Sequence, residues 1–281
     1  MEKSTRGLGI FVIVVLVFMG LCAAAIAAVA LGALTLPNLD LGISEPGQDR
    51  IEQSFDVGAF PSLTIKNFSG GVTVRVGEPG TIRVIATKRG LSKARRDQIV
   101  VDMTPQESGL AIETKKPSGL SIGSVDLEIT APPDTRLNLH TGSGGIEVDG
   151  LTEDLVVDTG SGGIDLRNVP GAIQASTGSG GIDVVGGGGP ARLQTGSGGI
   201  EYEGTPQGDC RFQTGSGGIV LRLPATLNIT VDLSTGSGGI DVEYDVSGQE
   251  SRNSVKGAIG TGDQGTIYAH TGSGSIDLKK Q

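Results

Sequence analysis

The chain has 281 residues, of which 48 are glycine and 3% are aromatic, and its formal net charge at pH 7 is −9. This acidic balance argues against nucleic-acid binding, because phosphate recognition needs a basic stripe. The scarcity of aromatic side chains, with no tryptophan, disfavours a polysaccharide-cleaving groove. The glycines recur at a fixed phase between apolar positions, which indicates an ordered repeat rather than low complexity.

The first predicted element is a membrane anchor. Residues 7–39 carry no charge, and residues 7–36 are long enough to cross a hydrocarbon core of about 30 Å at about 1.5 Å per residue. A cleaved signal peptide normally has an apolar run of only about 7–15 residues. We therefore expect a transmembrane signal anchor at residues 7–36 after a cytoplasmic tail at residues 1–6. Cleavage within the alanine-rich stretch 23–28 is the alternative.

The charges around this anchor predict its orientation. Lys3 and Arg6 precede the apolar run, whereas Asp40, Glu45 and Asp49 follow it. The positive-inside rule then places the N-terminus in the cytoplasm and the rest of the chain outside it. We expect a single-pass membrane protein with an extracellular or periplasmic main domain, and a membrane partner through the N-terminal helix.

A linker and a cap are predicted between the anchor and the repeats. Residues 37–54 include Pro46 and Gly47 and are expected to be the linker. Residues 55–135 alternate apolar and polar positions in longer strands and are expected to form an irregular capping part. The cap contains a basic cluster, which we expect to be a solvated loop or short helix, with a contact patch as the alternative: Lys88, Arg89, Lys93, Arg95 and Arg96.

Residues 136–281 contain an internal repeat. The hexapeptide T-G-S-G-G-I occurs six times, and a seventh copy reads T-G-S-G-S-I. The copies start at Thr141, Thr159, Thr177, Thr195, Thr214, Thr235 and Thr271. The starts are 18, 18, 18, 19, 21 and 36 residues apart, and the last interval is interpreted as two periods. Such a period is typical of a solenoid, in which each repeat contacts only its neighbours.

Each period is expected to hold two short strands and two turns. In the second copy, apolar and polar residues alternate over residues 155–159, G-S-G-G turns the chain, and alternation resumes at Ile164. A left-handed helix would need an aliphatic residue every six positions, but Ile146 is followed at that interval by Thr152 and Asp158. We therefore expect an all-β, right-handed parallel β-solenoid with rungs of about 18 residues, over residues 55–281 and after one transmembrane helix.

The chain resembles a known bacterial family on several stretches. These are V-D-L-E-I-T-A-P-P at residues 125–133, R-L-N-L-H-T-G-S-G-G-I-E-V at 136–148, the later T-G-S-G-G-I copies, and G-T-I-Y-A-H-T-G-S-G-S-I-D-L at 265–278. They are similar to the putative adhesin family of membrane-associated β-solenoid domains of unknown function, which is related to the head domain of putative auto-transporter adhesins. The resemblance implies a parallel β-solenoid, an envelope location and a binding or structural role. It brings no active site.

One column of carboxylates is the candidate metal site. The residue after the repeated isoleucine is acidic in six of seven copies: Glu147, Asp165, Asp183, Glu201, Asp241 and Asp277. Like charges at the rung spacing of about 4.8 Å repel by about 0.9 kcal/mol even in water, and a divalent cation would relieve this repulsion. Calcium needs six to eight oxygens, however, and a flat strand face offers few. The sequence therefore predicts a solvated acidic face, with calcium binding as the alternative and no other cofactor.

Catalytic residues are not expected. His140 and His270 share one column, predicted to lie about seven rungs apart, or roughly 34 Å. This column begins His140, Asp158, Ser176, which puts the aspartate in the middle, whereas a nucleophilic triad needs the histidine there. The two cysteines, Cys22 and Cys210, are too far apart to suggest a fold disulfide, and Cys210 is predicted to be a buried thiol.

The sequence thus predicts a non-enzymatic, membrane-anchored extracytoplasmic solenoid that acts as an adhesin-like binding or structural module. Its ligand is expected to be a surface glycan or a protein. Three alternatives stay open: a sensor or accessory subunit of an envelope-stress system, a calcium-binding repeat protein, and, as the least favoured, a polysaccharide-cleaving β-helix enzyme.

Overall fold

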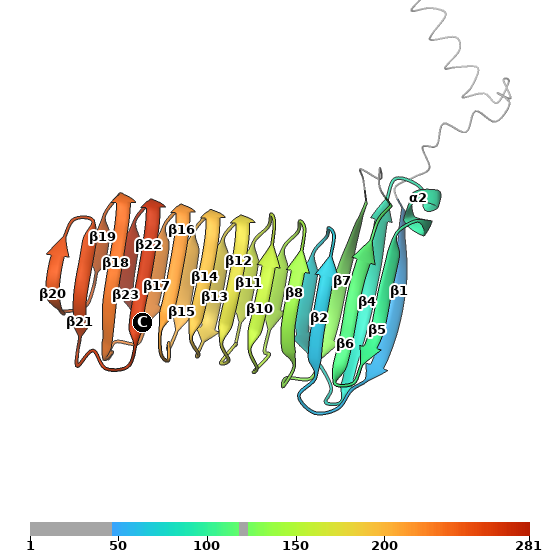
Figure 1. The fold of residues 1–281 in the computed structure, drawn as a ribbon, viewed down its shortest axis with the longest axis horizontal. Helices are drawn as coiled ribbons and strands as arrows, with labels where there is room; N and C mark the ends of the chain where they lie inside the picture. Colours follow the sequence, from blue (N-terminus) through green and yellow to red (C-terminus); the bar gives the residue numbers. More distant parts are fainter. Residues whose placement is uncertain (1–46, 118–122) are drawn as a thin grey trace, which may run out of the picture. The chain divides into compact units, whose positions relative to one another are not determined.

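Alternating apolar and polar residues build two β-sheets that face each other across a thin core (Figure 1). The computed structural model describes residues 47–117 and 123–281, which are mostly strand with one short helix, α2 (Lys93–Asp97). The predicted tail, the anchor and residues 37–46 of the predicted linker lie outside the described residues. Among the residues that are described, no helix is long and apolar enough to cross a membrane.

The two sheets are called sheet A and sheet B. In its described part, sheet A has the spatial order β1 (Gly47–Asp56), β4 (Thr81–Gly90), β7 (Ser124–Ala131), β3 (Val72–Val76), β9 (Ile146–Asp149), β11 (Ile164–Arg167), β13 (Ile182–Gly187), β15 (Ile200–Gly204), β17 (Ile219–Leu223), β23 (Ile276–Lys280) and β19 (Ile240–Val242). Sheet B has the order β20 (Val246–Ser251), β21 (Ser254–Ile259), β18 (Ile229–Ser237), β22 (Thr266–Ser273), β16 (Cys210–Ser216), β14 (Ala191–Ser197), β12 (Ile173–Ser179), β10 (Leu155–Thr159), β8 (Arg136–Thr141), β2 (Ser62–Asn67), β6 (Gly109–Lys115) and β5 (Val100–Gln106). One strand of sheet B and the sheet A strand that follows it form a rung.

The repeat length of the sequence is also the period of the stack. β10 pairs in parallel with β12, and Leu155 lies in register with Ile173. Alternate residues of β10 and β11 are buried, and they belong to one continuous apolar core. A single rung has nothing to cover its apolar face, so neighbouring rungs supply both the strand hydrogen bonds and the core contacts. The prediction of an all-β parallel solenoid is confirmed.

The T-G-S-G-G corner explains why the motif recurs. The buried Thr177 hydroxyl donates to the Gly162 carbonyl of the preceding rung at 2.9 Å, and Thr195 donates in the same way to Gly180. Gly180 has a φ of +142°, and a Cβ at this position would overlap the carbonyl group of Gly162. The fourth residue of the hexapeptide must be glycine because the backbones of adjacent rungs approach so closely there.

The order of the last rungs corrects one prediction. The 36-residue interval before Thr271 was interpreted as two sequential periods, but the rung β22/β23 lies between β16/β17 and β18/β19. After β17 the chain leaves a gap of one rung and forms β18/β19 on the far side of this gap. It then forms the antiparallel β20–β21 hairpin beyond β18 and returns to fill the gap with β22/β23. β23 consequently pairs on both sides, and β19 is the edge of sheet A.

The other end of the stack is built in a similar way. β6 and β7 form the outermost parallel rung, and β2/β3 lies between it and β8/β9. Antiparallel strands β4 and β5 then extend the two sheets. The linker predicted for residues 37–54 ends earlier than expected, because residues 47–56 form β1, which pairs with β4 along its whole length. Pro46 and Gly47 suggested a loop, and the pairing with β4 could not be read from local composition.

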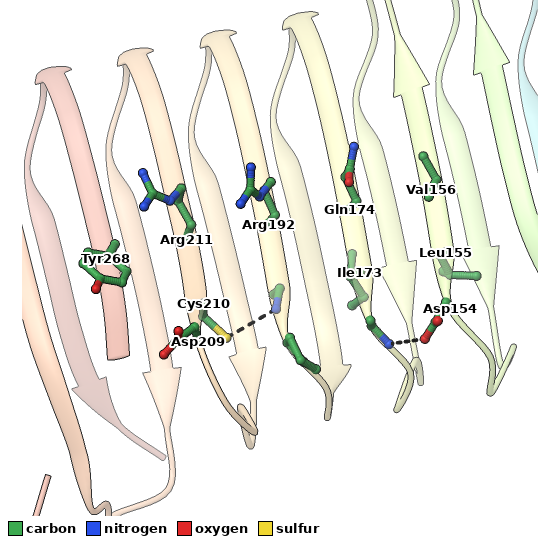
Figure 2. A pocket seen from close by; sticks show the side chains of 13 residues that line it. Asp154, Leu155, Val156, Ile173, Gln174, Arg192, Asp209, Cys210, Arg211 and Tyr268 are labelled. Atoms are coloured by element: carbon green, nitrogen blue, oxygen red, sulfur yellow. Dashed lines mark hydrogen bonds between the residues drawn. The ribbon is translucent and has the colours of Figure 1, made fainter. Parts of the chain in front are cut away.

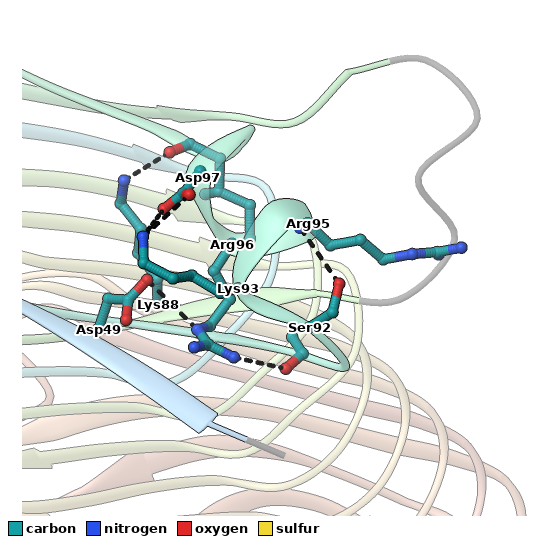
Figure 3. A network of polar contacts seen from close by, with 9 residues as sticks. Asp49, Lys88, Ser92, Lys93, Arg95, Arg96 and Asp97 are labelled. Atoms are coloured by element: carbon teal, nitrogen blue, oxygen red, sulfur yellow. Dashed lines mark hydrogen bonds and ion pairs between the residues drawn. The ribbon is translucent and has the colours of Figure 1, made fainter. Parts of the chain in front are cut away.

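The basic cluster belongs to this cap (Figure 3). α2 begins at the cap residue Ser92, and Arg96 is 7% exposed with its Nε 3.2 Å from Asp49 Oδ2 of β1. That contact is ionic rather than a well-aligned hydrogen bond. The other partners are internal too: Lys88 donates to Ile99 O, Arg89 pairs with Asp126, and Lys93 pairs with Asp97. The prediction of a solvated loop or short helix is confirmed only in part: Lys93, Arg95 and Arg96 lie on the short helix, but Arg96 is buried, and Lys88 and Arg89 lie on β4. Most of these charges hold the cap together.

Candidate functional site

The predicted acidic column exists on the outer face of sheet A. Glu147, Asp165, Asp183 and Glu201 lie in register on four successive strands, β9 to β15. Val220 interrupts the column, and the rearranged last rungs put Asp277 before Asp241. The six residues therefore form a single file rather than a pocket. Within residues 47–117 and 123–281, no group of three or more His, Cys, Asp or Glu side chains is arranged to hold a metal ion.

Arginines pair with the two ends of the uninterrupted part of the acidic column, Glu147 to Glu201. Arg75 lies 3.1 Å from Glu147, and Arg222 lies 3.0 Å from Glu201. Asp183, between these pairs, has a raised pKa because the surrounding protein partly desolvates it and because Asp165 and Glu201 repel its negative charge. Burial and like-charge repulsion thus act together on Asp183.

Removing this charge is expected to stabilise the fold at neutral pH. A carboxyl whose folded-state pKa is raised contributes stability below its unfolded pKa of about 3.9, and this contribution is lost as the pH rises through the folded-state value. Asp183→Asn should therefore raise the free energy of unfolding at pH 7 by up to about 1 kcal/mol, with little difference at pH 3. Denaturant unfolding of the full chain, followed by circular dichroism, measures both values.

The matched control is Asp241→Asn on the edge strand β19, where only Asp277 is an acidic neighbour in register. It should have a smaller effect. An Asp183→Asn variant that is less stable at pH 7 would contradict the repulsion argument. Thermal melts in calcium and in chelator test the calcium alternative. That alternative requires calcium to stabilise the wild-type chain but not the Asp183→Asn variant.

The histidine column begins in the predicted order His140, Asp158, Ser176, and only the place of His270 in it differs from the prediction. His140 Nδ1 lies 2.7 Å from Asp158 Oδ2, and Ser176 Oγ donates to Asp158 Oδ1 at 2.5 Å. The aspartate is the central member, so the arrangement of a nucleophilic triad is not formed here. The predicted seven-rung separation of the histidines is wrong. β22 is the direct neighbour of β16 in sheet B, so His270 lies five rungs from His140. His270 instead contacts Ser234.

A groove on sheet B was not expected from the sequence. It has a volume of about 490 Å³ and crosses β10, β12, β14, β16 and β22 where these strands begin (Figure 2). One outward residue from each strand lines it, and each lies in register with the next: Val156, Gln174, Arg192, Arg211 and Tyr268. All five side chains are exposed. A row of one aliphatic and four polar side chains thus runs across the rungs at the strand spacing of about 4.8 Å.

The two arginines are the distinctive feature of this groove. Arg192 and Arg211 lie on adjacent strands, and neither forms an ion pair with a carboxylate of the described residues. The guanidinium carbon of Arg211 lies 5.0 Å from the centre of the Tyr268 ring, which is a cation–π contact. Two unpaired guanidiniums side by side on an acidic protein form a local site for an anion.

The carboxylates that line the groove are already engaged by the backbone. Asp154 accepts the Ala172 N–H at 3.0 Å, and Asp209 accepts the Thr266 N–H at 2.9 Å. Figure 2 shows Asp209 near the start of its strand, with the Arg192 and Arg211 side chains directed away from it. These aspartates therefore fasten turns to the next rung, and they leave the guanidiniums unpaired.

Cys210 lies in the wall of the same groove. Its side chain is 1% exposed, and its sulfur accepts the Ala191 N–H at 3.3 Å. Burial raises the pKa of this thiol, so the reactive thiolate is disfavoured. The prediction of a buried cysteine is confirmed, and Cys210 acts as a small packing residue.

The rearranged rung order completes one end of the groove with Tyr268, and the sequence did not show this neighbour. In a sequential stack, β18 would follow β16 and place Asp232 beside Arg211. The insertion of β22 puts Tyr268 there instead, and Asp232 pairs with Lys256 of β21 at 2.8 Å. The sequence shows only that Arg192 and Arg211 occupy the same position of the repeat, three residues before the repeated threonine.

The stack and its grooved flank define a two-sheet parallel β-solenoid whose polar side chains are displayed on flat outer faces. Comparison with protein families then identifies the relatives of this fold. The chain belongs to the Toastrack DUF4097 family, whose pattern matches residues 43–279. The resemblance to this family of β-solenoid domains of unknown function is thereby confirmed.

Solved structures show similarity at low sequence identity. A putative cell adhesion protein from Clostridium sporogenes is 14% identical, with 83% of this chain and all of the other covered and a TM-score of 0.40. A putative adhesin from Bacteroides fragilis is 13% identical, with 84% and 98% covered and a TM-score of 0.40. A putative lipid binding protein from Parabacteroides distasonis is 14% identical, with 83% and 97% covered and a TM-score of 0.44. A comparison with curated proteins finds no match.

Proposed function

We propose that this chain is a non-enzymatic, membrane-anchored, extracytoplasmic module that binds a ligand on the flank of its solenoid, in an adhesin-like role, and that the solenoid is right-handed. The observation that supports this most directly is the groove on sheet B. Its outward side chains, among them Arg192 and Arg211, are not needed to pack the core, whereas the inward side chains of the same strands are buried. A regular stack with a free polar row fits binding better than catalysis. The apolar run at residues 7–36 supports the anchored location.

Protease accessibility tests the proposed location. The full chain, with an epitope after Gln281, is produced in a bacterium with a periplasm. We expect it in the membrane fraction after an alkaline wash, with the epitope digested by protease once the outer membrane is opened. An epitope that stays protected until the inner membrane is lysed would contradict the proposed orientation. A chain of reduced mass in the soluble fraction would instead indicate a cleaved signal peptide.

A sensor or accessory subunit of an envelope-stress system is the second candidate. It is supported by the predicted six-residue cytoplasmic tail and the span that follows it. Replacing residues 1–36 with an unrelated anchor of the same orientation distinguishes the two. A binding module should keep its ligand and its cellular role, whereas a subunit that signals through the span should lose its role and keep only ligand binding.

A further inference from the structure

We propose that the groove on sheet B binds a linear acidic polysaccharide, with Arg192 and Arg211 holding carboxylates of the glycan. This inference rests on the proposed extracytoplasmic binding role and names the ligand class of that groove. Each guanidinium presents a planar fork of N–H donors that matches a carboxylate with two parallel hydrogen bonds. No described carboxylate occupies either fork.

Tyr268 prepares one of these forks for its ligand. The guanidinium carbon of Arg211 lies over the Tyr268 ring, 5.0 Å from the ring centre. No carboxylate of the described residues pairs with Arg211, so its N–H groups remain available to a ligand. Holding the side chain in this way lowers the entropy lost on binding, since a free arginine samples many rotamers. Tyr268 is thus a positioning residue for Arg211.

The periodicity of the groove favours a linear polymer. Gln174, Arg192 and Arg211 lie in register on successive strands, so each rung offers one side chain at a regular interval of about 4.8 Å. A sugar unit in an extended polysaccharide advances the chain by a comparable length. The Gln174 amide can donate to and accept from hydroxyl groups, while the arginines take the carboxylates.

The same groove does not suit a lipid tail. Its outward row has one aliphatic member, Val156, which is 40% exposed, and its other outward members are polar or aromatic. An acyl chain would leave most of these polar groups desolvated without partners, which is unfavourable. The net charge of −9 opposes polyanion binding over most of the surface, so a carboxylated glycan is expected to bind where the two unpaired arginines lie on adjacent strands.

Binding of polygalacturonate to the full chain in nanodiscs tests this inference. The double variant Arg192→Gln/Arg211→Gln should weaken binding by at least about tenfold, because both carboxylate contacts are lost. The matched control is Arg167→Gln/Arg222→Gln, which removes the same charge from sheet A and should change the affinity by less than about twofold. Tyr268→Ala should weaken binding less than the double variant does, and Tyr268→Phe, which keeps an aromatic face, should retain most of it. Circular dichroism checks that each variant folds.

Other probes separate the glycan from general charge attraction. Neutral dextran should not bind, and polyphosphate should bind more weakly than polygalacturonate at physiological salt. Equal binding of both polyanions, or equal loss in both double variants, would overturn the inference in favour of nonspecific electrostatics. If polygalacturonate does not bind but the C-terminal epitope is accessible from outside the cell membrane, the ligand class is wrong and the proposed location stands.

Discussion

Gly180→Ala should destabilise the solenoid by about 3 kcal/mol or more, or prevent its folding. The φ of +142° is a conformation that alanine rarely adopts, and the added Cβ would overlap the Gly162 carbonyl of the preceding rung. The two backbones cannot separate without breaking strand hydrogen bonds on both sides of the corner. Denaturant unfolding of the full chain, followed by circular dichroism, measures the loss.

The neighbouring glycine supplies the control. A Cβ on Gly181 would come no closer than 3.6 Å to its nearest neighbour, the Gly199 carbonyl oxygen, and Gly181 does not need a positive φ. Gly181→Ala should therefore cost less than about 1 kcal/mol. Equal losses in the two variants would show that the corner is not sterically specific, and the explanation of the repeated motif would fail.

Ile276→Ala should destabilise the protein by about 2–5 kcal/mol, whereas Ile240→Ala should cost about 1 kcal/mol. The two isoleucines occupy the same position of the repeat and lie in register on β23 and β19. Ile276 is completely buried between two rungs, and Ile240 is partly exposed because β19 is the edge of sheet A. Truncation leaves a larger cavity where neighbours enclose the side chain on both sides.

This pair also tests the rung order. If the rungs followed the sequence, the last copy would be the terminal rung, and the two losses would be reversed. A larger loss for Ile240→Ala would therefore contradict the insertion of β22/β23. The same unfolding measurement serves for both variants, and since each removes the same atoms, the unfolded-state contribution is closely matched.

The repeat could be predicted well because its restraints are local and periodic. Ile146, Ile164 and Ile182 recur at 18 residues, and the same spacing sets their register in the stack. The cap was predicted less well. Residues 47–54 suggested a linker, yet their strand is formed by pairing with β4 some thirty residues later, and no local pattern specifies such a long-range contact.

The candidate sites divide in the same way. The acidic column was predictable because residues such as Asp165 and Asp183 share one phase of consecutive repeats, and phase alone places them in register. One end of the groove is formed by Tyr268 beside Arg211. These two residues are 57 positions apart in the sequence and are adjacent only because β22 inserts between β16 and β18.

The sequence by itself determined that this protein is a parallel β-solenoid, which side chains face inward, and that glycine must occupy each tight corner, since a strict period repeats one local environment. Only the tertiary structure decided the order of the last rungs, the pairing of β1 in the cap, and the neighbours of Arg211. Strands of the same repeat have nearly identical edges, so any of them satisfies the hydrogen bonds of its neighbour. The choice among them depends on chain connection and on packing at the two ends of the stack, which a periodic pattern does not encode.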